Sequence, residues 1–559
     1  MTLGNMTYKF GSVFMTTISM MLLIMNSALA QSSGEVQNET IIIEKNKQLD
    51  LPVANREFEK ISDPQPQSAQ TNSKYTVQEI GIVLPQFDTK VKVPTTKTDD
   101  PVEIHNGYVK AGFGNYVSPY LEGFIHTGQQ NNYSAGAKFK HLSAANGPYK
   151  GVKNSFNGLD LEGKYWTKNN WVSASAAAGR ERYTWYGYKN ANNLDFDNDS
   201  LKNIFNKFNA SISVGNMSKS KTKYITKFHY GYQGSNHNNN ESNVGGFVDL
   251  AHQKDSTHAI LGDVLVDYST YTNTSVFSRS LIGISGKYSV TIDRLKTTVG
   301  LNYTYSGDTL KGSLGSHVYP LIDLNYSLVP KKLVAVAGIK GGMEKNSWTS
   351  FTAQNPYLDQ NLTIANTNNT LNLYLGLRGH VQEKVNFKVG TAYLTYKNLW
   401  YMINSPVDTA KFIIVYDKEN ASVFNFNGEV SYDAKAIKTG LKLDYYSYSG
   451  YSLGTGISKK AWHRPSFVST FFVAYNIYKK IVLKTDIYYI SGISAINLVT
   501  NKEYNLKDIV DINLKAEYRF SDTFSAFIEV NNLLSSKYQR YMYYQSRGLN
   551  MMVGLTYRF

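Results

Sequence analysis

The chain has 559 residues, no cysteine and a formal net charge of +15. The lack of cysteine excludes disulfides, cysteine-ligated zinc, iron–sulfur clusters and a cysteine-anchored lipoprotein. Lys and Arg are spread along the chain rather than gathered on a recognisable module, which argues against nucleic-acid binding, while the 43 Tyr and the abundant Asn, Ser, Thr and Gly suit twisted strands, aromatic girdles and polar loops.

Residues 1–30 have the pattern of a secretory signal peptide. Lys9 supplies positive charge, Val13–Met25 form a short apolar core, and Ala28-Leu29-Ala30 is a small-residue cleavage site. The apolar core is too short to span a bilayer as a helix, and no other segment reaches the ~18 apolar residues that a spanning helix requires. We therefore expect export with cleavage near Ala30. Any membrane crossing would then use strands closed into a barrel, which satisfies every backbone polar group.

Residues 31–105 are expected to form an extended periplasmic segment. Prolines interrupt it at positions 52, 64, 66, 85, 94 and 101, and apolar clusters are few. A stretch of about 75 residues with this composition cannot bury enough apolar surface for a sizeable core.

From residue 106 onward, apolar and polar residues alternate over long stretches. In Leu549–Phe559, for example, every second residue from Leu549 is apolar or aromatic, and the same period recurs in Ile512–Phe520, Phe424–Tyr432 and Leu371–Leu377. In a strand, successive side chains point to opposite faces, so this alternation places the apolar residues against lipid and the polar residues in a water-filled interior. A soluble sheet with one solvated face explains one or two hairpins but needs a cover for so much apolar surface.

Short polar turns punctuate these strands. They are Gly128–Asn132, Lys168–Asn170, Met217–Lys221, Gln253–Thr257, Asp293–Arg294, Pro330–Lys332, Gln382–Lys384, Ala434–Ala436, Lys479–Lys480 and Ser521–Thr523. Two strands and usually a longer loop separate consecutive turns. The rhythm predicts an all-β protein whose residues 106–559 form a closed antiparallel transmembrane β-barrel of about 22 strands, with short periplasmic turns and long extracellular loops.

Several segments resemble TonB-dependent receptors. The stretch Asp511–Tyr538, with Asn531-Asn532-Leu533 as its most specific part, and Gly548–Phe559 resemble the end of that family's barrel, as does Ala461–Tyr475. Gly107–Gly128, continued by Tyr133–Gly147, resembles a group of shortened receptor-like barrels. The resemblance implies a 22-stranded barrel in the Gram-negative outer membrane. Residues 31–105 depart from the family because they are too few for its folded plug domain.

The resemblance also implies two candidate interaction segments. Thr40, Ile41, Ile42, Ile43, Glu44 and Lys45 resemble the short extended box that pairs with TonB as an added strand. The alternative is a flexible tether with a chance apolar triplet. Phe559, with Tyr557, resembles the terminal aromatic signal read by the outer-membrane insertion machinery, and an aromatic residue there also fits the interfacial girdle.

The sequence offers no catalytic constellation. The ten histidines show no HExxH pattern, and neither a P-loop nor a G-x-S-x-G elbow is present, so we expect no enzyme activity, no catalytic residue, no cofactor and no metal site. The loop aromatics Trp166, Trp171, Trp185, Trp348, Trp400, Trp462 and Tyr538–Tyr544, with Lys459, Lys460, His463 and Arg464, are expected to be interfacial girdle residues and contacts to lipopolysaccharide phosphates. Binding of sugars or anionic ligands is the alternative.

The resemblance implies uptake of a solute across the outer membrane, which would be either passive or coupled to TonB. A lumen of about 22 strands without a plug must be narrowed by residues 31–105, by inward-folded loops or by a partner protein. A second hypothesis is a non-transport scaffold whose lumen or periplasmic mouth binds a partner, and a third is a soluble β-rich secreted protein. The expected partners are outer-membrane lipid and lipopolysaccharide, the insertion machinery, and TonB or another lumen-filling protein.

Overall fold

The computed structural model describes residues 105–559, apart from 129–131, 190, 192–193, 197, 218–219, 418–419 and 450–458. The expected signal peptide and the expected TonB-pairing segment Thr40–Lys45 lie outside the described residues, as does all of the segment 31–105 except its last residue.

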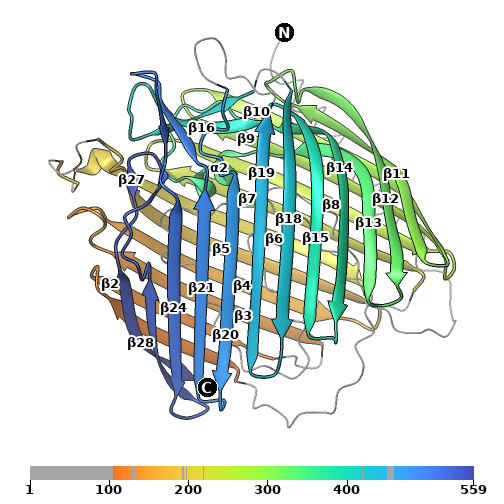
Figure 1. Ribbon diagram of the computed structural model, residues 1–559, viewed down its shortest axis with the longest axis horizontal. Helices are drawn as coiled ribbons and strands as arrows, with labels where there is room; N and C mark the ends of the chain where they lie inside the picture. The colour runs from red at the N-terminus through yellow and green to blue at the C-terminus, as the bar shows by residue number, and fades with distance from the viewer. Residues whose placement is uncertain are drawn as a thin grey trace. The chain divides into compact units, whose positions relative to one another are not determined.

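A single antiparallel sheet of 22 strands closes on itself (Figure 1). Its strands are β1 (Gly107–Gly114), β2 (Ser118–His126), β3 (Tyr133–Ala144), β4 (Asn154–Trp166), β5 (Asn170–Thr184), β6 (Lys202–Asn216), β7 (Thr222–Ser235), β8 (Asn240–Gln253), β9 (His258–Thr272), β10 (Val276–Ile292), β11 (Leu295–Gly307), β12 (Gly315–Val329), β13 (Leu333–Glu344), β14 (Thr367–Val381), β15 (Val385–Lys397), β18 (Ala421–Asp433), β19 (Ile437–Ser449), β20 (Phe467–Ile477), β21 (Ile481–Ser491), β24 (Ile509–Arg519), β25 (Phe524–Asn531) and β28 (Asn550–Arg558). The expected all-β barrel is confirmed, and its strand number matches the sequence estimate.

Small elements lie in the connections between barrel strands. They are the hairpins β16 (Trp400–Asn404) with β17 (Phe412–Tyr416), β22 (Ser494–Asn497) with β23 (Lys502–Asn505) and β26 (Gln539–Tyr541) with β27 (Tyr544–Gln545), the helix α2 (Trp348–Gln354) and the 3-10 helix η3 (Asp199–Leu201). In the part of the chain that the structure describes, no helix is both long and apolar enough to cross a bilayer.

The first and last strands close the barrel. β1 pairs with β28 in antiparallel register, and Phe559 extends this pairing because its N–H donates to the Gly107 carbonyl at 3.0 Å. On the inner side of the seam, Lys110 Nζ lies 3.0 Å from Glu529 Oε1, and Lys515 Nζ lies 3.3 Å from the same oxygen. Backbone pairing and buried ion pairs therefore both hold the seam.

The ten expected short turns all join neighbouring barrel strands at one end. They connect β2–β3, β4–β5, β6–β7, β8–β9, β10–β11, β12–β13, β14–β15, β18–β19, β20–β21 and β24–β25. The opposite end carries all the longer connections, including residues 345–366, 398–420 and 532–549. This asymmetry is typical of outer-membrane barrels, whose short turns face the periplasm.

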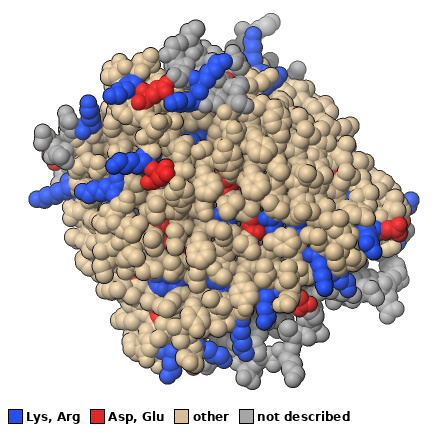
Figure 2. Space-filling model, in the orientation of Figure 1, with Lys and Arg blue, Asp and Glu red and all other residues tan. Residues whose placement is uncertain are grey.

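The two faces of the wall separate as the alternation predicts. Leu555 and Phe426, both expected on lipid, are 50% and 38% exposed, whereas the neighbouring Thr556 and Asn425 are each 1% exposed. Most of the face in Figure 2 is uncharged, and Lys and Arg side chains project mainly at its margins. An outer surface of exposed apolar side chains over a closed sheet is the surface of a transmembrane barrel, an architecture of outer membranes.

Candidate gate: a loop cap inside the barrel mouth

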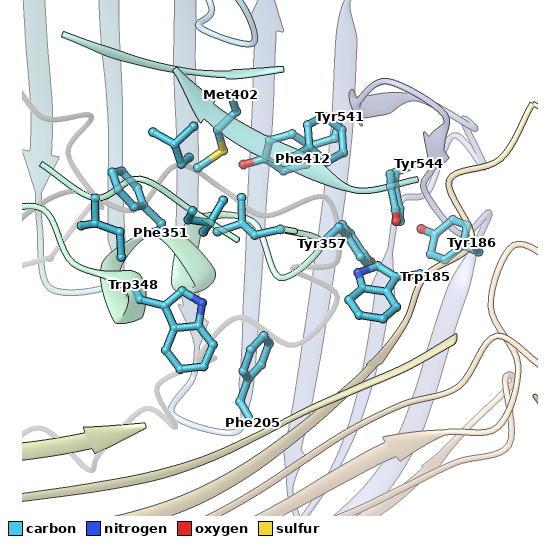
Figure 3. Packing of buried hydrophobic residues seen from close by; sticks show 14 of the residues in the cluster. Trp185, Tyr186, Phe205, Trp348, Phe351, Tyr357, Met402, Phe412, Tyr541 and Tyr544 are labelled. Carbon is cyan, nitrogen blue, oxygen red and sulfur yellow. The ribbon is translucent and has the colours of Figure 1, made fainter. Parts of the chain in front are cut away.

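Connections from several sides of the barrel fold inward at the long-loop end and pack on one another. We call this assembly the loop cap and define it as the described residues of 185–201, 345–366, 398–417, 459–466, 492–508 and 532–549. Its main core contains Trp185, Tyr186, Trp348, Phe351, Tyr357, Met402, Phe412, Tyr541 and Tyr544, which pack against Phe205 and Tyr271 of the wall (Figure 3). The loops thus build a hydrophobic core of their own within the barrel mouth.

Helix α2 anchors the loop cap to the wall. Ser347 and Ser350 form a capping box at its first turn, which satisfies backbone groups that a short helix leaves unpaired. The buried Glu241 carboxylate of β8 accepts hydrogen bonds from the Trp348 N–H at 3.1 Å and from the Thr349 N–H and hydroxyl, both at 2.8 Å. A carboxylate at a helix N-terminus also interacts favourably with the partial positive charge there.

Further wall side chains bind the same connection on both sides of α2. Arg279 of β10 donates to the Asn346 carbonyl at 2.7 Å, and Gln233 of β7 donates to Thr352 Oγ1 at 2.8 Å. Tyr271 of β9 donates to the Gln360 carbonyl at 2.8 Å. Asn203 of β6 donates to the Pro356 carbonyl at 2.7 Å. These hydrogen bonds hold residues 345–366 against the inner side of strands β6 to β10.

The hairpin β16–β17 joins the loop cap through backbone pairing. Leu358 and Phe412 form an isolated parallel bridge, in which the Phe412 N–H donates to the Tyr357 carbonyl at 3.0 Å and the Asp359 N–H to the Phe412 carbonyl at 2.7 Å. Two connections that are separate in sequence are therefore held in one fixed register.

Tyr544 lies where four connections meet. Its ring stacks on Tyr357 with centroids 3.7 Å apart and contacts Tyr186 edge-on at 4.7 Å. Its hydroxyl donates to the Ala410 carbonyl at 2.5 Å, and the neighbouring Tyr541 hydroxyl donates to the Gln354 carbonyl at 2.8 Å. Burial raises the pKa of Tyr544, so this hydroxyl stays a donor at physiological pH.

His463 occupies a fully buried position between the β16 connection and β26–β27. Its Nδ1 donates to the Met402 carbonyl at 2.7 Å, and its Nε2 accepts from the Met542 N–H at 3.3 Å. A ring that accepts at Nε2 must be neutral, and burial, with Arg540 nearby, lowers the pKa of His463 to about 3.

Two arginines lie in the same part of the loop cap. Arg540 is 1% exposed and donates from Nη1 to the His463 carbonyl at 2.9 Å, while its Nε and Nη2 find no hydrogen-bond partner among the residues that the structure describes. Arg464 donates from Nη2 to the Trp400 carbonyl at 2.9 Å, and its guanidinium carbon lies 4.3 Å from the centre of the Trp400 ring. The loop cap therefore holds buried positive charge that is costly to remove from water.

The sequence-based interpretation of the loop aromatics as girdle residues is wrong for most of them. Trp185 and Trp348 are each 2% exposed and Trp462 is 0% exposed, because they fill the cores of the loop cap. Trp166 and Trp171 lie next to a short turn instead, near Lys164. The sequence carries no signal for inward folding, since an aromatic run has the same composition in a girdle and in a core.

The remaining candidate residues lie outside the hydrophobic cores of the loop cap. Tyr557 and Phe559 are 52% and 46% exposed on the outer face, with ring centroids 6.1 Å apart. Lys460 pairs with Glu503 at 2.7 Å. Among the described residues, no group of three or more His, Asp or Glu side chains is arranged to hold a metal ion.

Comparison with known proteins identifies the fold. No family model and no curated protein matches the chain. Solved structures do: the FrpB iron transporter of Neisseria meningitidis (F3-3 variant) is 9% identical with a TM-score of 0.64, covering 82% of each chain. The siderophore receptor PirA of Acinetobacter baumannii is 10% identical with a TM-score of 0.61, covering 83% of this chain and 81% of that one.

A mutant of the ferric enterobactin receptor PfeA of Pseudomonas aeruginosa is 12% identical with a TM-score of 0.59, covering 81% of this chain and 80% of that one. The chain therefore has the barrel fold of TonB-dependent receptors, as the segments around Asn531 and Phe559 implied.

Proposed function

We propose that this protein is an outer-membrane receptor-like barrel that takes up a solute, and that the loop cap is its outer gate. The observation that carries the proposal is the loop cap itself, in which connections from several strands pack on one another and on the wall at the mouth of a 22-stranded barrel. Barrels of 22 strands need such an obstruction to avoid leakage. The similar structures are named as an iron transporter and as siderophore receptors, and their names support an uptake role without fixing the solute.

The remaining sequence-based interpretations belong to the same proposal. Residues 1–30 are a signal peptide cleaved near Ala30, residues 31–105 are a periplasmic segment, and residues 106–559 are the barrel. Thr40–Lys45 pair with TonB, and Phe559 with Tyr557 is read by the insertion machinery. We propose no enzymatic role and no cofactor, since the similar structures are named as transporters and receptors.

Locking the loop cap tests its role as a gate. Leu358 and Phe412 face each other in a parallel bridge, where neighbouring strands lie ~4.8 Å apart and a disulfide can form. The chain has no native cysteine, so Leu358→Cys with Phe412→Cys gives one defined cross-link. Uptake should fall when the pair is oxidised and recover on reduction, and either single cysteine variant is the control. Uptake that is indifferent to oxidation would refute gating by these connections.

Conductance provides the second test. The intact protein in a planar bilayer should conduct weakly, and variants that loosen the loop cap, such as Tyr357→Ala, should conduct more. A protein lacking residues 31–105 shows whether that segment also obstructs the lumen. A large permanent conductance of the intact protein would contradict an occluded transporter.

One observation favours the alternative of a non-transport scaffold. Wall side chains of β6 to β10 strap residues 345–366 with buried hydrogen bonds, which suits a fixed cap as well as a gate. A scaffold predicts that a partner protein copurifies from gently solubilised membranes and that oxidation of the 358–412 cysteine pair changes no phenotype. Recovery of the barrel alone, with uptake lost in the locked form, would exclude it.

A further inference from the structure

Two arginines face outward from the barrel wall. The exposed apolar side chains of β4 and β6, such as Leu161 and Ile212, fix which positions face lipid, and the continuous register places Ala176 and Ala178 of β5 on that side. Arg180 and Arg182 follow Ala178 by two and four residues on the same strand, so their side chains leave the backbone on the same, outward side. Neither guanidinium has an ion-pair partner among the described residues, and Arg182 Nε is buried without a hydrogen bond.

No other arginine in the described barrel strands shares this orientation. Arg279 binds Asn346 inside the mouth, Arg378 binds Asn325 of the inner wall, and Arg558 binds Glu517 inside the seam, while Arg519 alternates with the outward Tyr518. An arginine against hydrocarbon costs about 2–4 kcal/mol at mid-membrane and less near the interface. We therefore expect Arg180 and Arg182 to lie at the level of the lipid headgroups rather than in the hydrocarbon core.

The polarity of the outer face changes abruptly at Arg180. Cross-strand register puts His141, Asn157, Arg180 and Asn206 in one row across β3 to β6. The adjacent row toward the short-turn end holds Phe139, Leu159, Ala178 and Phe208. His141 Nδ1 and Asn157 Oδ1 lie 2.7 Å apart, so a hydrogen-bonded polar surface borders apolar wall directly.

An apolar groove of about 560 Å³ lies below this border, in the same strands. Its floor is Ala174, Ala176 and Ala210, and the larger outward side chains of Leu161, Ile212, Phe228, Tyr230 and Val244 form its sides. Ala176 and Arg180 are four residues apart on β5, which is about 13 Å along a strand. One amphiphile can therefore bring an anionic head to the arginines and an acyl chain into the groove.

We infer that this surface binds lipopolysaccharide through its lipid A, a phosphorylated sugar that carries several acyl chains. The arginines lie toward the long-loop end of β5, which is the outer-leaflet side in outer-membrane barrels. A guanidinium group can bind a phosphate through two parallel hydrogen bonds, and His141, Asn157 and Asn206 offer hydrogen bonds to sugar hydroxyls. The inference needs the membrane orientation of the barrel and does not depend on its role in transport.

Binding of purified lipid A to the full chain in mild detergent, followed by native mass spectrometry, tests the inference. Each surface cation contributes a factor of about five to the binding of anionic lipid, so Arg180→Gln with Arg182→Gln should weaken binding roughly 30-fold. Ala176→Phe fills the groove floor and should weaken binding while leaving both arginines in place. Lys397→Gln, at the long-loop end of β15 and away from the groove, is the matched control and should bind like the wild type.

Heat-modifiable migration in gel electrophoresis verifies that each variant is a folded barrel. Equal affinity of the wild type and the double arginine variant would overturn the inference, as would an Ala176→Phe variant that binds normally. Phosphatidylglycerol is tested in the same way, and preference for it over lipid A would overturn the assignment of the ligand. Failure of uptake in the cross-linked protein would leave this result unchanged, so the two proposals are tested separately.

Discussion

Removing the Glu241 carboxylate should release helix α2 from the barrel wall. This carboxylate accepts three hydrogen bonds from Trp348 and Thr349, and it is the one charged group of the wall that contacts the first turn of α2 among the described residues. A hydrogen bond to a charged group contributes about 1.5–3 kcal/mol, and three bonds to one carboxylate are less than additive. We expect Glu241→Ala to destabilise docking of α2 by about 3–5 kcal/mol.

Amide hydrogen exchange of residues 348–354 measures this effect. Each 1.4 kcal/mol is a factor of ten, so exchange in Glu241→Ala should accelerate at least a hundredfold. Glu241→Gln keeps one acceptor oxygen and should accelerate exchange about tenfold. Asp263→Asn is the control, because Asp263 pairs with Lys287 at 2.6 Å in the wall. Equal protection of α2 in Glu241→Ala and the wild type would refute the argument that this carboxylate anchors the loop cap.

Three further predictions concern the loop cap, the lipid face and the seam. Burial lowers the pKa of His463 to about 3 from an ordinary ~6.5. At a pH between these values the His463 ring therefore binds a proton when the loop cap comes apart, but not while it is packed. Stability of the loop cap should be full above pH 6.5 and fall by about 3 kcal/mol at pH 4.5, as exchange between pH 7 and 4 would show. His463→Phe should lack this dependence, and a wild type without it would contradict the buried neutral ring. Leu375→Arg, on a side chain 61% exposed to lipid, should cost about 2–4 kcal/mol in urea titrations of vesicle-inserted barrel, whereas Leu375→Phe should change little. Phe559→Ala should reduce the amount of inserted barrel in cells without altering the unfolding midpoint of purified protein, and unchanged insertion would refute its role as a signal.

The seam explains why the Phe559 prediction separates assembly from stability. The Phe559 ring is 46% exposed, so its removal loses only part of the contact area that a core phenylalanine would lose, and the backbone pairing with Gly107 is independent of the side chain. An effect confined to insertion would therefore point to recognition during assembly.

The sequence by itself determined the wall. Strand period places Leu555 and Phe426 outside and Thr556 and Asn425 inside without reference to the rest of the chain, because alternation is a property of each strand. Turn chemistry is equally local, which is why the ten short turns and the number of strands followed from the residues alone.

Only the tertiary structure decided what fills the barrel mouth. Trp348, Trp462 and Tyr544 become core residues because loops from distant strands meet in the lumen, and no local pattern records that meeting. The acceptor that anchors α2 is Glu241, more than a hundred residues earlier in the chain. A gate made of long-range contacts is set by closure of the sheet, which brings together residues whose separation in sequence carries no periodic signal.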